Sequence, residues 1–204
     1  MHPELRDDDA YWDNGYDPHI VDSPLSDRGV AQCASERKTL HSGNTPTLIV
    51  VSPLTRALQT AALVYGGGEA EVLVWPALRE HGDNSCDVGR SGAVLLASPE
   101  GAMAVRALPA LGSQLAALGP QWWGAGTLAH CAPGTGIQPP HRETAAEIAL
   151  RVADIRATIQ GRGPVGTLIA QHPRVVLVGH SCIFHDLVGE WLDNCVPHEV
   201  QHCR

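Results

Sequence analysis

Two short runs of apolar, mostly β-branched residues stand out along the chain. Residues 47–51 read TLIVV and residues 174–179 read RVVLVG. Uninterrupted apolar runs of this length are typical of strands buried on both faces of a parallel sheet. A weaker third run, EVLVW at residues 71–75, alternates enough to predict another strand. The pattern therefore predicts a buried, mostly parallel sheet.

Helical patterns separate these strands. Ser26 is predicted to cap a helix that runs to about Leu40. After the first strand, Ser52 and the following Pro53 predict the start of a second helix. Three glycines at residues 66–68 predict its end. Further helices are predicted at residues 98–119 with an interruption at Pro109, and at residues 143–160 and 181–192. Strands alternating with helices predict a three-layer α/β/α sandwich.

The chain reads as one domain, residues 1–204, that begins with an irregular acidic stretch of about 24 residues. Residues 96–140 are interpreted as an insertion or lid. Their second half is rich in Gly and Pro and has no hydrophobic period.

Composition narrows the function. The formal net charge of −8 argues against nucleic acid and anionic membrane surfaces as partners, yet a few focused arginines still permit a small anionic substrate. No apolar run is long enough to span a membrane, and the acidic start resembles no secretory signal. Six dispersed cysteines predict reduced thiols in a cytoplasmic protein. Eleven histidines form no metal-binding motif, so we expect no metal and no other cofactor. The oligomeric state is left open.

Candidate chemistry lies where the two strong strands end. Arg56 falls in the first turn of the helix after the first strand, where backbone N–H groups and a guanidinium favour a phosphate. His180 and Ser181 directly follow the other strong strand. Ligands of α/β sheets gather at the carboxyl ends of strands, so these residues are predicted to share a site.

The chain resembles the histidine phosphatase superfamily, the phosphoglycerate mutase-like proteins. Residues 52–61, SPLTRALQTA, are similar to its motif Ser-Pro-Leu-x-Arg-Ala-x-Gln-Thr-Ala, and residues 176–181, VLVGHS, to its second histidine motif. Four weaker elements occur in the family's order: residues 22–32, residues 78–89, Glu143 with Arg151, and Asn194 with Glu199. The resemblance implies a phosphoglycerate mutase-like fold.

The resemblance also implies roles. Arg56, His180 and Ser181 would bind the transferring phosphoryl group, and His180 would stabilise its oxygens as charge develops. Glu80 would be the general acid that protonates the leaving alcohol. The implied activity is hydrolysis of small phosphomonoesters through a phosphohistidine, with mutase chemistry as a variant. Without the resemblance, a loop salt bridge from Glu80 to Arg79 or Arg90 is the simpler interpretation.

The family's opening strand, which ends in Arg-His-Gly and supplies the attacking histidine, has no counterpart here. His2 and His19 are the histidines before Pro24, and neither follows an apolar run. The chain as given is therefore expected to lack the first central strand of the sheet, to be inactive and to be marginally stable. A truncated coding sequence and a selected pseudoenzyme both fit this picture.

Two other functions stay open. A pseudoenzyme would bind a phosphorylated ligand without turnover. A serine hydrolase would use Ser181 as nucleophile, since residues 176–181 also resemble the turn after a strand in α/β-hydrolases. In that motif a glycine is expected where Ile183 stands, and few residues remain to provide acid and base partners.

Overall fold

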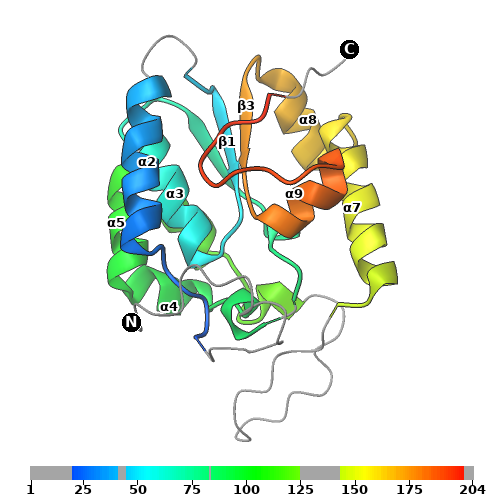
Figure 1. Cartoon of the computed structure of the whole chain (residues 1–204), viewed down its shortest axis with the longest axis horizontal. Helices are drawn as coiled ribbons and strands as arrows, with labels where there is room; N and C mark the ends of the chain where they lie inside the picture. The colour runs from blue at the N-terminus through cyan, green and yellow to red at the C-terminus, as the bar shows by residue number, and fades with distance from the viewer. Residues whose placement is uncertain (1–19, 41–44, 83, 125–142, 200–204) are drawn as a thin grey trace, which may run out of the picture.

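The computed structural model describes residues 20–40, 45–82, 84–124 and 143–199 (Figure 1). Its sheet has three parallel strands in the order β2-β1-β3. In register, Val50 lies between Leu73 and Leu177. The strands are β1 (Leu48–Val51), β2 (Glu71–Val74) and β3 (Val175–Val178). All three predicted strands are thus present, in a mixed α/β fold consistent with a phosphoglycerate mutase-like architecture.

Helices cover both faces of the sheet, as Figure 1 shows. On one side lie α3 (Thr55–Tyr65), α4 (Gly92–Ala97), α5 (Pro99–Ala107) and α6 (Leu111–Ala116), with α2 (Asp27–Leu40) packed on α3. On the other lie α7 (Ala145–Ile159), α8 (Gly163–Gln171) and α9 (Ser181–Val188). Short 3₁₀ helices span Pro76–Leu78, Ser85–Asp87 and Trp122–Gly124.

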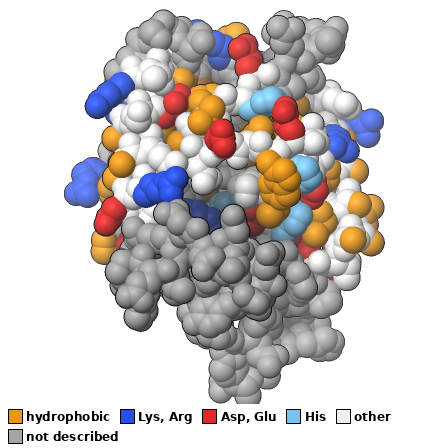
Figure 2. Space-filling view, in the orientation of Figure 1, with side chains coloured by type: hydrophobic (Ala, Val, Ile, Leu, Met, Phe, Trp, Pro, Cys, Tyr) orange, Lys and Arg blue, Asp and Glu red, His pale blue; other side chains and the backbone are white. Residues whose placement is uncertain are grey.

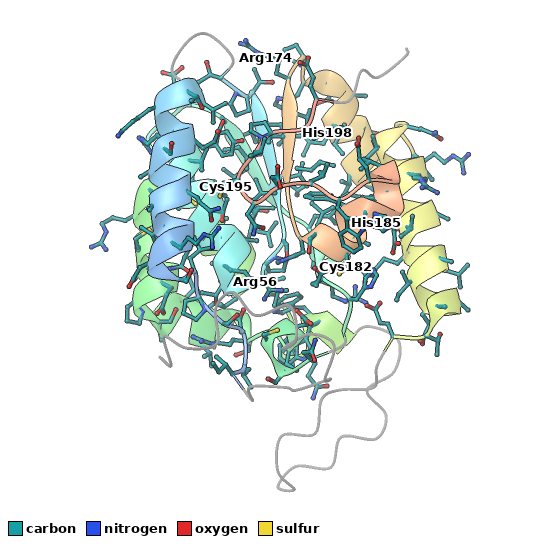
Figure 3. The ribbon with its side chains drawn as sticks, viewed as in Figure 1. Arg56, Arg174, Cys182, His185, Cys195 and His198 are labelled. Atoms are coloured by element: carbon teal, nitrogen blue, oxygen red, sulfur yellow. The ribbon has the colours of Figure 1, made fainter. Side chains whose placement is uncertain are left out.

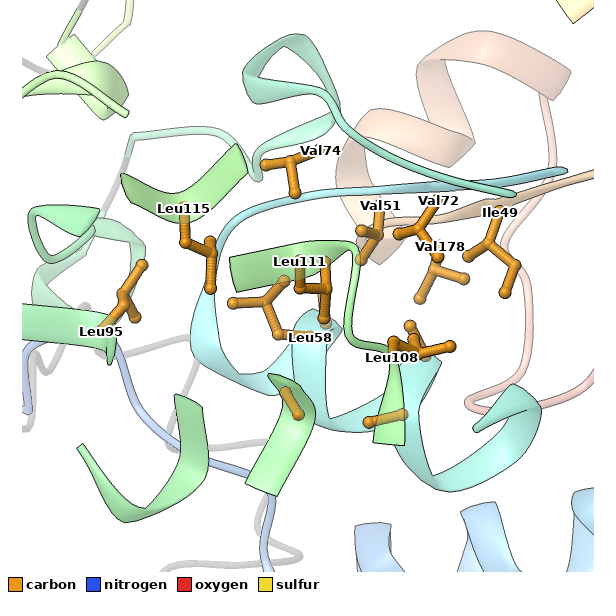
Figure 4. Close-up of a cluster of buried hydrophobic side chains, with 14 residues drawn as sticks. Ile49, Val51, Leu58, Val72, Val74, Leu95, Leu108, Leu111, Leu115 and Val178 are labelled. Carbon is orange, nitrogen blue, oxygen red and sulfur yellow. The ribbon is translucent and has the colours of Figure 1, made fainter. Parts of the chain in front are cut away.

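Alternation along β1 divides the core in two. Ile49 and Val51 pack with α3, α5 and α6 (Figure 4), whereas Leu48 and Val50 pack with α7 and α9. All four side chains are fully buried, because successive side chains of a central strand point to opposite covered faces. This explains why the run at 47–51 is continuously apolar.

Residues 96–118, which are included in the predicted insertion, pack against the sheet. Leu108, Leu111 and Leu115 are buried in the core beside the sheet. The Gln114 side chain also accepts a hydrogen bond from Val74 N and donates one to Val72 O, which covers the free edge of β2. This part of the chain is therefore a structural layer. Residues 125–140 lie outside the described residues.

Helix boundaries follow local capping. Ser26 Oγ accepts a hydrogen bond from Gly29 N, as predicted for the start of α2. The last helix ends at Val188 rather than near 192, because Gly189 takes a left-handed conformation with φ of 86°. Helix α8 was not predicted, because the two glycines and the proline in GPVGTLIAQ disfavour a helix.

The predicted cap of α3 is wrong. This helix begins at Thr55, and Ser52 lies three residues earlier. The Thr55 N–H donates instead to the Asp22 carboxylate at 2.7 Å, and its hydroxyl donates to the other carboxylate oxygen. A residue from a distant segment thus caps the helix, which leaves Ser52 available for other contacts.

None of the helices in the described ranges combines the length and apolar character that crossing a bilayer requires.

Candidate functional site

The carboxyl ends of β1 and β3 place Ser52 and His180 side by side. The Ser52 N–H donates to Val178 O at 2.9 Å, which extends the pairing of the two strands by one step. His180 Nε2 lies 2.9 Å from Ser52 Oγ, and both residues are buried. The sheet register therefore fixes the position of the His180 ring.

The His180 imidazole is held in its neutral form. Burial lowers its pKa well below the usual value of 6.5, and the positive charges of Arg56 and Arg151 lower it further. A neutral imidazole still donates one N–H and accepts at its other nitrogen. Arg56 in the first turn of α3 and His180 before α9 each follow the carboxyl end of a strand, and these two strands, β1 and β3, pair in parallel.

Arg56 points toward the loop that follows Glu80. Its guanidinium donates to Cys86 O and to the Asp87 carboxylate, each at 2.8 Å, and its side chain is 21% exposed. The Asp87 side chain is 5% exposed, and burial raises its pKa although Arg56 acts in the opposite direction. Arg56 is thus fixed in place by a buried carboxylate.

Glu80 lies at the N-terminus of α9. Its carboxylate accepts hydrogen bonds from Cys182 N and Ile183 N at 3.2 Å, and the Ser181 hydroxyl is 3.5 Å away. The expected alternative, a salt bridge to Arg79 or Arg90, is not formed, because those arginines pair with Glu143 and Asp22 respectively. Glu80 and Ser181, both predicted site residues, are therefore brought together.

Carboxylates therefore occupy the first turns of both helices that start at this edge, Asp22 on α3 and Glu80 on α9. Helix N-termini favour negative charge, so both positions are also suited to an anionic ligand. Asp22 is fully buried, and burial raises its pKa against the opposing effects of Thr55 and the arginines. Cys182 and Arg56 lie at this end of the sheet in Figure 3.

A buried ion network supports the Glu80 loop from behind. Glu143 binds Arg79 at 2.7 Å and Arg151 at 2.6 Å, and it accepts from Gly82 N at 3.2 Å. Arg151 also donates to the carbonyls of Ala77 at 3.0 Å, Arg79 at 2.7 Å and Glu80 at 3.4 Å. The network holds the backbone on both sides of Glu80.

Sequence reasoning did not find three partners in the site: Ser52 for His180, Asp87 for Arg56 and Asp22 for α3. A signal was present in the motifs, since each of these residues lies within a stretch that carries the family resemblance. Among the described residues, no three His, Cys, Asp or Glu side chains form a group suited to a metal ion.

Comparison with known families finds a match in the first part of the chain. Residues 18–88 match the histidine phosphatase superfamily (branch 1). The matched stretch includes Arg56 and Glu80, whereas His180 and Ser181 lie beyond it. The match confirms the resemblance over these residues. No curated protein and no solved structure matches the chain.

The depressed pKa of His180 predicts how stability varies with pH. Because its pKa is lower in the fold than in the unfolded chain, His180 binds a proton more readily after unfolding. Its contribution is complete above about pH 6.5 and is lost as the pH falls toward the folded value. We expect the melting temperature of the wild type to fall more than that of His180→Asn between pH 7.5 and 5.5. Parallel curves for the two proteins would contradict a neutral, buried His180.

Proposed function

We propose that the chain forms the phosphoryl-binding part of a phosphomonoester-processing site of the histidine phosphatase type. Arg56, His180 and Ser181 bind the phosphoryl oxygens of a small phosphorylated substrate. Glu80 acts as the general acid that protonates the leaving alcohol. Hydrolysis of the phosphomonoester is the main activity proposed. Mutase chemistry would additionally need a pocket that retains a bisphosphate and lets it reorient.

The observation that carries the proposal is the shared position of Arg56 and His180. They follow the carboxyl ends of β1 and β3, which pair in parallel, and the charge of Arg56 adds to burial in lowering the pKa of His180. A guanidinium supplies a bidentate donor, and a buried imidazole adds an N–H in a site of low dielectric. These are the donors that a phosphoryl group needs as negative charge develops on its oxygens.

Glu80 fits the proton-transfer role by its place at the α9 N-terminus. Backbone N–H groups of Cys182 and Ile183 now hold its carboxylate. A phosphoryl group bound at α9 would take over these donors and free Glu80 to face the leaving oxygen. The nearby Asp87 is buried and ion-paired with Arg56, and it is therefore less suited to proton transfer.

The attack on phosphorus needs a histidine in line with the leaving group. None of the chain's histidines stands in the family's Arg-His-Gly context. The proposal therefore assigns binding and polarisation to the residues present, and we expect these 204 residues to bind phosphate analogues without turnover. A cytoplasmic location is also part of the proposal, in keeping with the free thiols of the described cysteines.

Orthovanadate binding and p-nitrophenyl phosphate hydrolysis test the proposal together. We expect calorimetry to detect vanadate binding and the hydrolysis assay to stay at background. Turnover with an acid-labile phosphohistidine would show that another histidine attacks and would overturn the expected inactivity. Absence of vanadate binding would remove the proposed site altogether.

The pseudoenzyme interpretation predicts the same two results, and one geometric observation favours it. Arg56 and Glu80 are both satisfied by protein groups before any ligand binds. A chain carrying an added strand that ends in Arg-His-Gly distinguishes the two: gain of turnover supports a phosphatase, and unchanged binding without turnover supports the pseudoenzyme.

The serine hydrolase alternative gains no support from the geometry. The Ser181 hydroxyl approaches Glu80, and the His180 ring nitrogen faces Ser52 instead. Labelling of Ser181 by a fluorophosphonate would support the serine hydrolase alternative.

A further inference from the structure

Two cysteines far apart in sequence meet away from the proposed phosphate site. Cys33 on α2 and Cys195 on the segment after α9 are separated by 162 positions, and their sulfur atoms lie 3.4 Å apart. Figure 3 shows Cys195 on the C-terminal segment. Both are free thiols in this structure.

We propose that Cys33 and Cys195 form a reversible redox site that joins α2 to the C-terminal segment under oxidising conditions. The inference stands independently of the proposed phosphate chemistry. The oxidant is a small disulfide of the glutathione class.

The surroundings of the two thiols hold them in position. Cys33 is fully buried, and its Sγ also lies 3.8 Å from Thr60 Oγ1 on α3. Cys195 sits in a tight turn in which Val196 N donates to Asp193 O at 3.2 Å. Its φ of 59° is left-handed, a conformation that residues with side chains adopt infrequently. The turn thus holds an unfavourable backbone conformation at the residue that faces Cys33.

The contact also activates the pair. Hydrogen bonding from Cys195 lowers the pKa of the Cys33 thiol to about 7, against the opposing effect of burial. The same contact raises the pKa of Cys195. The pair therefore loses its first proton near neutral pH, and thiolates are the reactive form in disulfide exchange.

Oxidation proceeds by two exchanges. The proton that the pair retains first passes from Cys195 to Cys33 across their contact. The partly exposed Cys195 then attacks one sulfur of glutathione disulfide as the thiolate, forms a mixed disulfide and releases one glutathione thiolate, which takes up the Cys33 proton. The Cys33 thiolate then attacks Cys195 Sγ and releases the second. Two protein S–H bonds and one glutathione S–S bond are replaced by one protein S–S bond and two glutathione thiols. The protein is oxidised by two electrons, and glutathione disulfide is reduced by two.

The bond would connect the two sides of the molecule. Helix α2 packs on α3, which carries Arg56, and Cys195 follows α9, which begins beside His180. A cross-link that closes so long a loop restricts mainly the unfolded chain. We therefore expect oxidation to raise the melting temperature by roughly 5–10 °C.

The test equilibrates the full chain in glutathione redox buffers and maps disulfides by mass spectrometry of unreduced digests. We expect one dominant linked pair, Cys33 with Cys195, together with the rise in melting temperature and its reversal by dithiothreitol. Cys195→Ser removes both signals, whereas the matched control Cys203→Ser, eight positions later, keeps them. Pairing of Cys33 with Cys203 or Cys131 to a similar extent, or a fully reduced pair in glutathione disulfide alone, would overturn the proposal.

Discussion

Arg56→Met is expected to weaken orthovanadate binding by roughly 10- to 100-fold, the range for losing a charged hydrogen-bond donor from a partly buried site. Methionine retains the length of the side chain but supplies neither charge nor N–H groups. Arg56→Lys keeps the charge but loses the planar guanidinium with its paired N–H donors. Its affinity for vanadate should therefore lie between those of the wild type and Arg56→Met. Calorimetric titration of the three proteins measures the series.

Two controls keep this result specific. Arg37 donates to Leu63 O and Gly66 O at the opposite end of α3, so Arg37→Met removes an arginine without touching the site. We expect its vanadate affinity to match the wild type. A melting curve of Arg56→Met shows whether losing the contact to Asp87 unfolds the protein. Wild-type affinity in a folded Arg56→Met protein would exclude Arg56 as a phosphoryl ligand.

Glu143→Gln should lower the free energy of unfolding by about 3–5 kcal/mol, the cost of breaking a buried ion network. The side chains of Arg79, Glu143 and Arg151 are 11%, 11% and 9% exposed, so water cannot replace the lost charge fully. The glutamine amide would also present an N–H₂ group to a guanidinium. Urea denaturation of the variant and the wild type gives the difference.

Glu147→Gln is the matched control, four positions later in the first turn of α7. Glu147 closes the capping box of α7 with Thr144, and glutamine also serves in that position, so the expected change is below about 0.5 kcal/mol. Equal destabilisation by the two substitutions would contradict the role assigned to the network. Because Arg151 holds the carbonyls around Glu80, a folded Glu143→Gln protein should also show greater hydrogen exchange in residues 77–82.

Local sequence was sufficient where burial imposes a pattern. The continuous apolar run predicted β1 because a strand covered on both faces tolerates few polar side chains. The strand β2 was predicted from its alternation, and β3 from an apolar run of which only Val178 is buried. The start of α2 followed from the hydroxyl of Ser26. In contrast, α8 was missed because tertiary packing stabilises a sequence whose glycines and proline disfavour a helix.

The site was predicted less completely because its contacts are made across the fold. The motifs located Arg56, Glu80, His180 and Ser181 but not what holds them. Asp87 meets Arg56 from 31 positions away and Ser52 meets His180 from 128. No local period encodes such pairs, since only the parallel pairing of β1 with β3 and the path of the Glu80 loop bring them together. The roles of the four predicted residues stay predictions.

The most direct test follows the His180 ring itself during a titration with inorganic phosphate. Nitrogen-15 NMR of labelled protein resolves the two imidazole nitrogens. We predict a saturable shift of the His180 signals whose midpoint equals the calorimetric dissociation constant, and its loss in Arg56→Met. Phosphate binding that leaves the His180 signals unchanged in the wild type would contradict a common phosphoryl site for Arg56 and His180.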